Sequence, residues 1–176
     1  MRHALAAAAV AALLPAAGAA LEPRFDHRDA QGPVLELLFD YDSLTASGRS
    51  TNAWRPALRA GWGADVTGDG GELIVSADLA LRSWSDPGAR RVLLSTSARY
   101  RGYFGTEEWK TFFEAGLWTP LRSRFGVGPL VGLGVVHDFS QDTGVFAGAE
   151  FATAFGDGRI VSVAGLAGLQ LRFAMP

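Results

Sequence analysis

The fold of this chain is decided by residues 35–41 (LELLFDY) and residues 54–60 (WRPALRA). In each stretch, one of the two alternating sets of positions is apolar. The other set holds acids in the first stretch and arginines in the second. Successive side chains of a β-strand point to opposite faces, so this alternation is typical of a strand that separates two environments. We therefore predict two β-strands, each with one apolar face and one charged face.

The two predicted strands also match each other when they are paired antiparallel. A register that places Glu36 opposite Arg59 also places Asp40 opposite Arg55, so that each acid faces a base. On the other face, the same register pairs Tyr41 with a tryptophan. Cross-strand neighbours of opposite charge or of apolar character stabilise a sheet. Because one register satisfies both faces, we predict a hairpin with this register.

The same alternation recurs in eight segments separated by turn-forming Gly, Ser, Asp and Pro residues. In all eight, one set of positions is free of charge and the other set collects the charged residues. We predict an all-β fold, an eight-stranded antiparallel up-and-down β-barrel, with strands at 34–42, 53–64, 72–82, 92–101, 108–117, 127–136, 145–155 and 160–173. The residues assigned to the charged face are Glu36, Asp40, Arg55, Arg59, Glu72, Asp78, Arg82, Arg99, Arg101, Glu108, Lys110, Glu114, Glu150 and Arg172.

The N-terminus has the three parts of a secretory signal peptide. Arg2 and His3 supply positive charge, residues 4–14 are apolar but too few to cross a bilayer as a helix, and small residues follow at 16–20. We predict cleavage near residue 19 or 20, a periplasmic tail at 21–32 and one barrel domain at 33–176. The chain has no cysteine, which excludes a lipid anchor on an N-terminal cysteine and a disulfide-stapled scaffold. Its net charge of −2 gives no reason to expect nucleic acid as a partner.

The apolar face is predicted to lie outside the barrel and to span a membrane. Small residues accompany the charges on the other face, which suits the narrow interior of an eight-stranded barrel. That face holds seven acids and seven bases, as expected of buried charges that need partners. Aromatic residues of the apolar face lie toward the strand ends, as in the girdles at the two membrane surfaces. The residues assigned to the girdles are Tyr41, Trp54 and Phe155 at one rim and Trp62, Tyr100, Trp109 and Phe173 at the other.

This pattern resembles that of the small eight-stranded outer-membrane barrels of the OmpA and OmpX type over residues 33–173. Strand 160–173, with Leu169, Leu171 and Phe173 alternating, is similar to the C-terminal signal that the barrel-assembly machinery recognises. That family usually ends on the aromatic residue, whereas residues 174–176 follow Phe173 here. The resemblance implies a protein of the Gram-negative outer membrane that contacts outer-membrane lipid and lipopolysaccharide and is inserted by the assembly machinery. We expect a monomer with both termini in the periplasm.

One candidate catalytic cluster lies at the end of the sixth predicted strand. His137 stands close to Asp138, Ser140 and Asp142, which are residue types of a nucleophile and base system. Neighbours on a strand point to opposite faces, so His137 and Asp138 do not share one site there. An ordinary turn is therefore the favoured interpretation.

A second candidate cluster lies inside the predicted barrel. Three glycines of strand 127–136 point inward, and Glu114 and Glu150 flank this wall without side chains. One interpretation is a small cavity for a ligand or for acid–base chemistry. The favoured one is that aromatic side chains fill the gap while Lys110 or an arginine partners the acids. We predict no cofactor and no metal site, because the three histidines are far apart and cysteine is absent. The residues around the wall are Gly128, Leu130, Gly132, Gly134, Phe112 and Phe146.

Three functions fit the sequence. The favoured hypothesis is a non-enzymatic envelope protein whose lumen is filled by side chains and does not conduct. Its outward loops, predicted at 43–52, 83–91, 118–126 and 156–159, are short and offer little material for a receptor or an enzyme site. The first alternative is a barrel enzyme that modifies lipid A or phospholipid through His137, Glu114 or Glu150. The second is a soluble periplasmic barrel, similar to a lipocalin, that binds an apolar ligand.

Overall fold

The computed structural model describes residues 31–46, 49–66, 71–81, 93–105, 108–121, 126–140, 142–156 and 158–173. The predicted signal peptide at 1–20 and the predicted tail up to residue 30 lie outside the described residues. The same holds for Arg82 of the predicted charged face and for residues 174–176.

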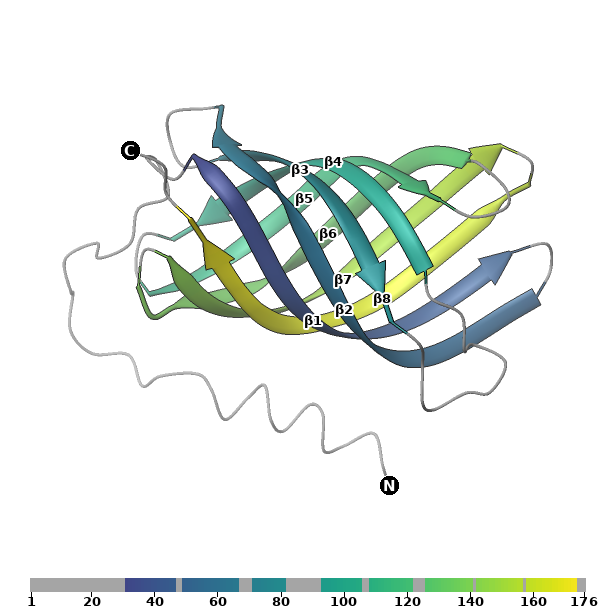
Figure 1. Cartoon of the computed structure of the whole chain (residues 1–176), viewed down its shortest axis with the longest axis horizontal. Coiled ribbons are helices and arrows are strands. Elements are labelled where there is room, and N and C mark those ends of the chain that lie inside the picture. Colours follow the sequence, from purple (N-terminus) through teal and green to yellow (C-terminus); the bar gives the residue numbers. More distant parts are fainter. Residues whose placement is uncertain are drawn as a thin grey trace, which may run out of the picture.

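Eight β-strands close into a barrel in which neighbours in the chain pair antiparallel and the last strand pairs with the first (Figure 1). This topology confirms the predicted eight-stranded up-and-down barrel. The barrel begins at Gly32 and ends at Phe173 on the same side, which we call the terminal end. The opposite side, where four hairpins turn, is the loop end. The strands are β1 (Gly32–Ala46), β2 (Arg49–Asp65), β3 (Glu72–Ala80), β4 (Leu93–Phe104), β5 (Trp109–Pro120), β6 (Gly126–Asp138), β7 (Thr143–Gly156) and β8 (Ile160–Arg172).

The hairpin of β1 and β2 has the predicted register. Glu36 lies opposite Arg59, and Asp40 lies opposite Arg55. The prediction succeeds because a shift of one residue would exchange the two faces of a strand, and both faces are strongly specified here.

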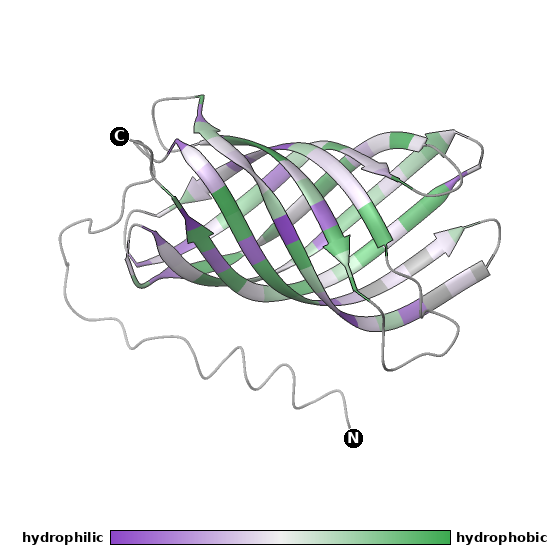
Figure 2. Cartoon of the chain, viewed as in Figure 1, coloured by the Kyte–Doolittle hydropathy of each residue, from purple (hydrophilic) through white to green (hydrophobic). Residues whose placement is uncertain are grey.

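The apolar set of positions points out of the barrel and the charged set points in. Leu37 and Val131 are 47% and 52% exposed, whereas Arg59 and Glu72 are 4% and 0% exposed. Hydrophobic and hydrophilic residues therefore alternate clearly along β1 and β2 (Figure 2). In a water-soluble barrel that carries an apolar ligand the two faces would be exchanged, so the structure has the arrangement of a barrel that faces hydrocarbon.

The first hairpin is longer than predicted. Most of the loop predicted at 43–52 belongs to β1 and β2, where Ser43 pairs with Asn52 and Thr45 with Ser50. The Thr45 hydroxyl donates a hydrogen bond to the Ser50 hydroxyl at 3.1 Å. Hydrogen bonds between backbone groups need no apolar side chain. The pairing of β1 with β2 therefore continues into residues 43–52, although their polar composition is typical of a loop.

The ends of several other strands also differ from the bounds predicted from the composition of the sequence. Residues 102–104, which fall between the predicted strands 92–101 and 108–117, belong to β4, because this strand continues to Phe104. Gly102 of β4 pairs with Phe113 of β5, and the absence of a side chain on Gly102 leaves room for the Phe113 ring. A Cβ on Gly102 would lie 2.2 Å from Phe113 Cε1. Similarly, β6 continues to Asp138 and β5 to Pro120, whereas β3 stops at Ala80, two residues early.

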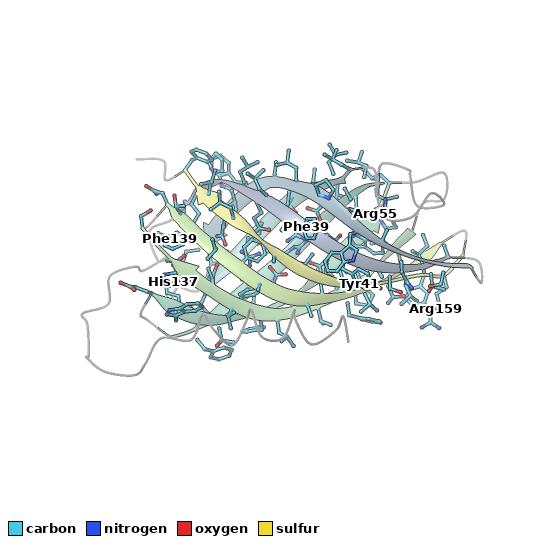
Figure 3. All side chains as sticks on the ribbon, turned by 90° about the horizontal axis from the view of Figure 1, so that it is seen from below. Phe39, Tyr41, Arg55, His137, Phe139 and Arg159 are labelled. Atoms are coloured by element: carbon cyan, nitrogen blue, oxygen red, sulfur yellow. The ribbon has the colours of Figure 1, made fainter. Side chains whose placement is uncertain are left out.

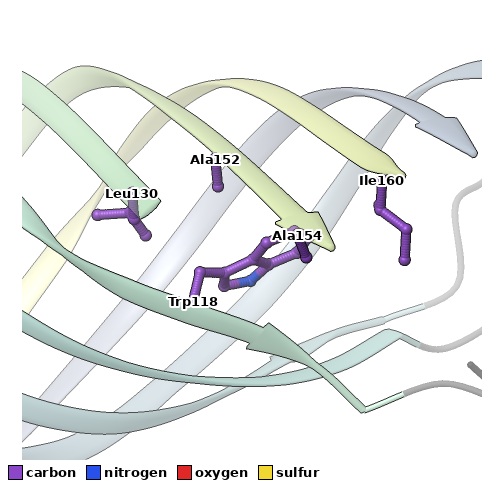
Figure 4. Close-up of a cluster of buried hydrophobic side chains, with 5 residues drawn as sticks. All are labelled: Trp118, Leu130, Ala152, Ala154 and Ile160. Atoms are coloured by element: carbon purple, nitrogen blue, oxygen red, sulfur yellow. The ribbon is translucent and has the colours of Figure 1, made fainter. Parts of the chain in front are cut away.

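Apolar side chains pack inside the barrel at two levels. Toward the loop end, Trp118 and Leu130 pack with Ala152, Ala154 and Ile160 (Figure 4). Nearer the terminal end, a second cluster is formed by Leu38, Phe112, Val136 and Phe146. Within the described ranges, no helix has the length and hydropathy needed to cross a membrane.

Candidate functional site

The middle of the lumen is occupied by buried ion pairs centred on Arg59 of β2. Its guanidinium donates hydrogen bonds to Glu36 Oε2 at 2.9 Å, to Asp78 Oδ1 at 2.9 Å and to Glu150 Oε2 at 3.1 Å. Glu36 and Asp78 come from the two strands that flank β2, whereas Glu150 comes from β7. One arginine therefore bridges the lumen between distant parts of the barrel wall.

Two arginines of β4 extend this network. Arg99 donates to Glu150 Oε2 at 2.8 Å and to Glu114 Oε2 at 3.1 Å. Arg101 donates to Glu114 Oε1 at 2.6 Å and to Glu36 Oε1 at 2.8 Å, and its guanidinium carbon lies 5.1 Å from the centre of the Phe112 ring. The linked set thus joins four carboxylates and three guanidinium groups across the lumen. Its members are Glu36, Asp78, Glu114, Glu150, Arg59, Arg99 and Arg101.

Side-chain hydroxyl groups complete the network on one side. Ser76 and Ser97 lie opposite each other on β3 and β4, with their Oγ atoms 3.0 Å apart. Ser76 donates to Asp78 Oδ1 at 3.1 Å, and the Arg99 Nη2 donates to Ser97 Oγ at 2.6 Å. These bonds satisfy groups that would otherwise be costly to bury.

A second layer of polar groups lies nearer the terminal end. Arg172 of β8 contacts Glu72 and donates to the Tyr103 hydroxyl at 2.6 Å. In a separate pair, the Lys110 ammonium donates to Asp138 Oδ2 at 2.9 Å. Acids and bases are therefore paired through most of the terminal half of the lumen.

Three members of these layers were missed by the sequence analysis. Tyr103 falls between two predicted strands, Asp138 falls in the turn predicted beside His137, and Gln170 is not part of the predicted charged face. Gln170 Oε1 accepts a hydrogen bond from Arg101 at 3.2 Å. Position parity would have found all three, because each lies in the inward set of positions of its own strand.

At Gly134, the glycine wall of β6 is covered by the Phe112 ring. A Cβ on Gly134 would lie 2.6 Å from Phe112 Cζ, and one on Gly148 would lie 3.3 Å from the same atom. Phe146 meets Phe112 edge to face, with ring centres 6.4 Å apart. Glu114 and Glu150 on either side of the wall both bind arginines. This geometry supports the interpretation in which aromatic rings fill the gap and bases partner the acids.

A cavity of about 80 Å³ remains in the loop half of the lumen. Its walls include Leu38, Trp118 and Leu166, and its floor is made by the network residues Arg59, Asp78 and Glu150. It arises because small inward residues, Ala57, Ala80, Ser95, Ser162 and Ala164, occupy this level of the barrel.

His137 and Asp138 do not form a site together. Asp138 points inward to Lys110, whereas the His137 ring stacks on Trp109 outside, with ring centres 4.5 Å apart. Figure 3 shows His137 beside Phe139 at the terminal end. The Asp142 backbone N–H donates to Ser140 Oγ at 3.2 Å, as in a turn. No group of three or more His, Asp or Glu side chains in the described part of the chain is arranged to hold a metal ion.

The remaining described residues of the predicted charged face, Asp40, Arg55 and Glu108, lie toward the two ends of the barrel. Asp40 and Arg55 face each other across β1 and β2, nearer the loop end, and Arg55 is buried. Glu108 precedes β5 at the terminal end, where its carbonyl oxygen accepts a hydrogen bond from the Asp138 N–H at 2.9 Å.

The aromatic residues assigned to girdles all lie in the outward set of their strands. Tyr41 and Trp54 are in contact, with ring centres 4.7 Å apart, and Tyr100 and Phe113 lie 5.7 Å apart. The exposed members of the set are Tyr41, Trp54, Trp62, Phe155 and Phe173, while Tyr100 and Trp109 are half-buried.

No protein-family model and no curated protein matches this sequence. Among solved structures, the barrel is similar to Neisserial surface protein A, with a TM-score of 0.63 and 16% identity over 81% of this chain and 97% of that chain. The N-terminal β-barrel domain of Pseudomonas aeruginosa OprF gives a TM-score of 0.46 and 15% identity over 79% and 98% of the two chains. Ail, the attachment invasion locus protein of Yersinia pestis, gives 0.47 and 12% over 81% and 99%. On the strength of the first likeness and of the closed topology, this chain has the fold of the small eight-stranded outer-membrane β-barrels.

Proposed function

We propose that the chain spans the bacterial outer membrane as a structural or surface element of the envelope, without enzymatic chemistry and without an open pore. The observation that carries this proposal is the orientation of the two faces. Large apolar side chains such as Leu133 and Phe151 point outward, while Arg99 and Glu36 are fully buried inside. Hydrocarbon stabilises the first arrangement, and mutual pairing stabilises the second.

The closed lumen supports the absence of conduction. Arg59, Arg99 and Arg101 fill the middle of the barrel and bond to acids on both sides of it. An eight-stranded barrel is only wide enough for side chains. Ions would therefore have to break several paired, desolvated contacts to pass.

The distribution of charge supports an orientation with the loop end toward lipopolysaccharide. Arg159 lies exposed at that end (Figure 3). The connections at the terminal end, 66–71, 105–108 and 139–142, contain acids but no Lys or Arg. Guanidinium groups pair well with phosphate, and lipid A carries phosphates. By sequence, the corresponding segments between the other strand pairs are 47–48, 81–92, 121–125 and 157–159, and they contain Arg82, Arg90, Arg91, Arg122, Arg124 and Arg159 against Asp86 and Asp157.

Membrane fractionation tests the location. We expect the protein to stay in carbonate-washed outer membranes and to show a folded, faster-migrating form in gels without heating. N-terminal sequencing of that material should begin at residue 20 or 21. Release by the carbonate wash would contradict the proposal and favour the soluble barrel.

Two further measurements test the absence of a pore and of enzymatic activity. Purified protein in planar bilayers should give no conductance steps, and the mass spectrum of lipid A should be the same with and without the protein. A changed lipid A profile would instead favour a lipid-modifying enzyme.

A further inference from the structure

We propose that the cavity in the loop half of the lumen binds a small organic ammonium ion with a short alkyl chain. This site is independent of the envelope role described above. The cavity extends from the ion-pair network to the loop-end residues Leu93, Pro120 and Ile160 of three strands. A water molecule needs about 10–15 Å³ of such space, so the cavity has room for about five to eight non-hydrogen atoms.

The floor of the cavity presents carboxylates in preference to guanidinium groups. The side chains of Asp78 and Glu150 are 15% and 12% exposed, whereas those of Arg59 and Arg99 are 5% and 0% exposed. The two acids are therefore more accessible than the arginines that they pair with, and both acids line the cavity.

One oxygen of Glu150 is left for a further donor. Among the described residues, the hydrogen bonds from Arg59 and Arg99 both end on Glu150 Oε2. The other oxygen, Oε1, accepts none of these bonds. An ammonium group has three N–H donors and no acceptor, so it can donate a charge-assisted hydrogen bond to the unused carboxylate oxygen, which is stronger than a bond from a neutral donor.

The charge of the network also favours a cation. The linked set contains four carboxylates and three guanidinium groups, and the facing pair of Asp40 and Arg55 leaves this difference unchanged. A cation in the cavity would balance the extra negative charge. In a low-dielectric interior, such a contribution is larger than in water.

The walls select an alkylammonium ion over a hydrated metal ion. Leu38, Leu166 and Ile160 offer apolar surface, and Trp118 offers an aromatic ring near which a cation is stabilised. A hydrated metal ion would bury its water shell against these apolar groups, whereas a butyl chain would displace water from them. The lining therefore matches a charged head on the floor and a short apolar body above it.

The experiment follows the indole N–H resonance of Trp118 by NMR in the full chain folded in detergent micelles, assigned through Trp118→Phe. Three ligands, n-butylammonium, n-butanol and n-butyrate, are added to the protein in separate titrations at matched salt. We expect a saturable shift of the Trp118 resonance with a Kd in the millimolar range for n-butylammonium. The Kd for n-butanol should be at least about tenfold weaker, because a charge-assisted hydrogen bond is lost. The outward Trp54, Trp62 and Trp109 serve as internal references for ligand that enters the micelle.

Variants separate binding in the cavity from other effects. Ala164→Leu fills the cavity and should abolish the saturable shift, whereas Ala167→Leu, which adds the same bulk to the outward face of β8, should leave it unchanged. Glu150→Gln should weaken n-butylammonium binding about tenfold while binding of n-butanol stays the same. The fold of each variant is checked by heat-modifiable gel mobility.

Three results would overturn the proposal. They are a shift that does not saturate, equal affinity for n-butylammonium and n-butanol, or equal n-butylammonium binding by the folded Ala164→Leu and Ala167→Leu variants. If Ala164→Leu does not fold, Ser162→Val on the same strand takes its place, with the same expected loss.

Discussion

At the scale of single residues, Arg59 is the centre of the ion-pair network in the lumen. It bonds to acids on β1, β3 and β7, and it is buried. Burying such a group is expensive, and the cost is offset only while all its partners are present. Because Arg59 and its partners form one linked set, the loss of Arg59 leaves several charges without this partner.

Replacement of Arg59 by alanine should strongly destabilise the barrel. We expect a loss of about 3–5 kcal/mol in the free energy of unfolding, because three carboxylates lose a buried partner. Urea unfolding in phospholipid vesicles, followed by tryptophan fluorescence, measures this loss. The control is Arg159→Ala at the exposed loop end, which should change stability by less than about 0.5 kcal/mol. Equal effects of the two variants would contradict the central role of Arg59.

Two glycines make a second prediction at this scale. A Cβ on Gly134 would lie 2.4 Å from the Ala147 carbonyl oxygen, whereas a Cβ on Gly165 meets no atom within 4 Å. We expect Gly134→Ala to destabilise the barrel by about 1–3 kcal/mol, as overpacking does. Gly165→Ala should be neutral or stabilising by up to about 1 kcal/mol, since alanine restricts the unfolded chain. The same urea titration compares them, and a reversed order would show that the wall is not packed as described.

At the scale of strands, the two faces follow different rules. Inward positions accept charge if a partner is close, while outward positions in the middle of the barrel accept only apolar side chains. Toward the loop end of β1 and β2, outward positions become polar, as Ser43 and Thr45 show. A strand therefore changes environment along its length as well as from face to face.

Placing an arginine on the outward face of β6 tests this difference. Leu133, which is 66% exposed, should not tolerate the change. We expect Leu133→Arg to cost about 2–4 kcal/mol in lipid vesicles, as for charges near the bilayer midplane, and Thr45→Arg to cost about 0–1 kcal/mol, as near the membrane surface. Equilibrium folding into vesicles measures both. A harmless Leu133→Arg would mean that this face contacts water.

At the scale of the whole molecule, the side chains inside the lumen are arranged in layers. Ion pairs fill the middle and the terminal half, apolar side chains pack between them, and a cavity remains toward the loop end. Long side chains of β4 reach across the lumen, since Arg101 meets Glu36 on β1 and Arg99 meets Glu150 on β7.

Shortening these arginines should open a path for ions. We expect the Arg99→Ala, Arg101→Ala double variant, once shown to be folded by gel mobility, to give small conductance steps in planar bilayers. The steps should favour cations, because Glu36, Glu114 and Glu150 remain in the path. Arg159→Ala should remain silent. A silent double variant would show that other side chains suffice to close the barrel.

The sequence by itself determined the number of strands, the faces of each strand and the register of the first hairpin. These are local properties. The parity of a position tells which way its side chain points, and the match of Glu36 with Arg59 needs only two adjacent strands. Strand ends were less accessible to this reasoning, because backbone pairing continues through Ser43 or Gly102 whatever their usual preference for turns.

Only the tertiary structure decided which acid meets which base across the lumen, and where space remains. Arg101 and Glu36 are 65 positions apart in the chain, and Arg99 and Glu150 are 51 apart. Their contact depends on how the closed barrel staggers its strands, and this stagger is set by all eight pairings together. The cavity has the same origin, because small residues such as Ala57 and Ala164 leave a gap only when closure brings them to one level.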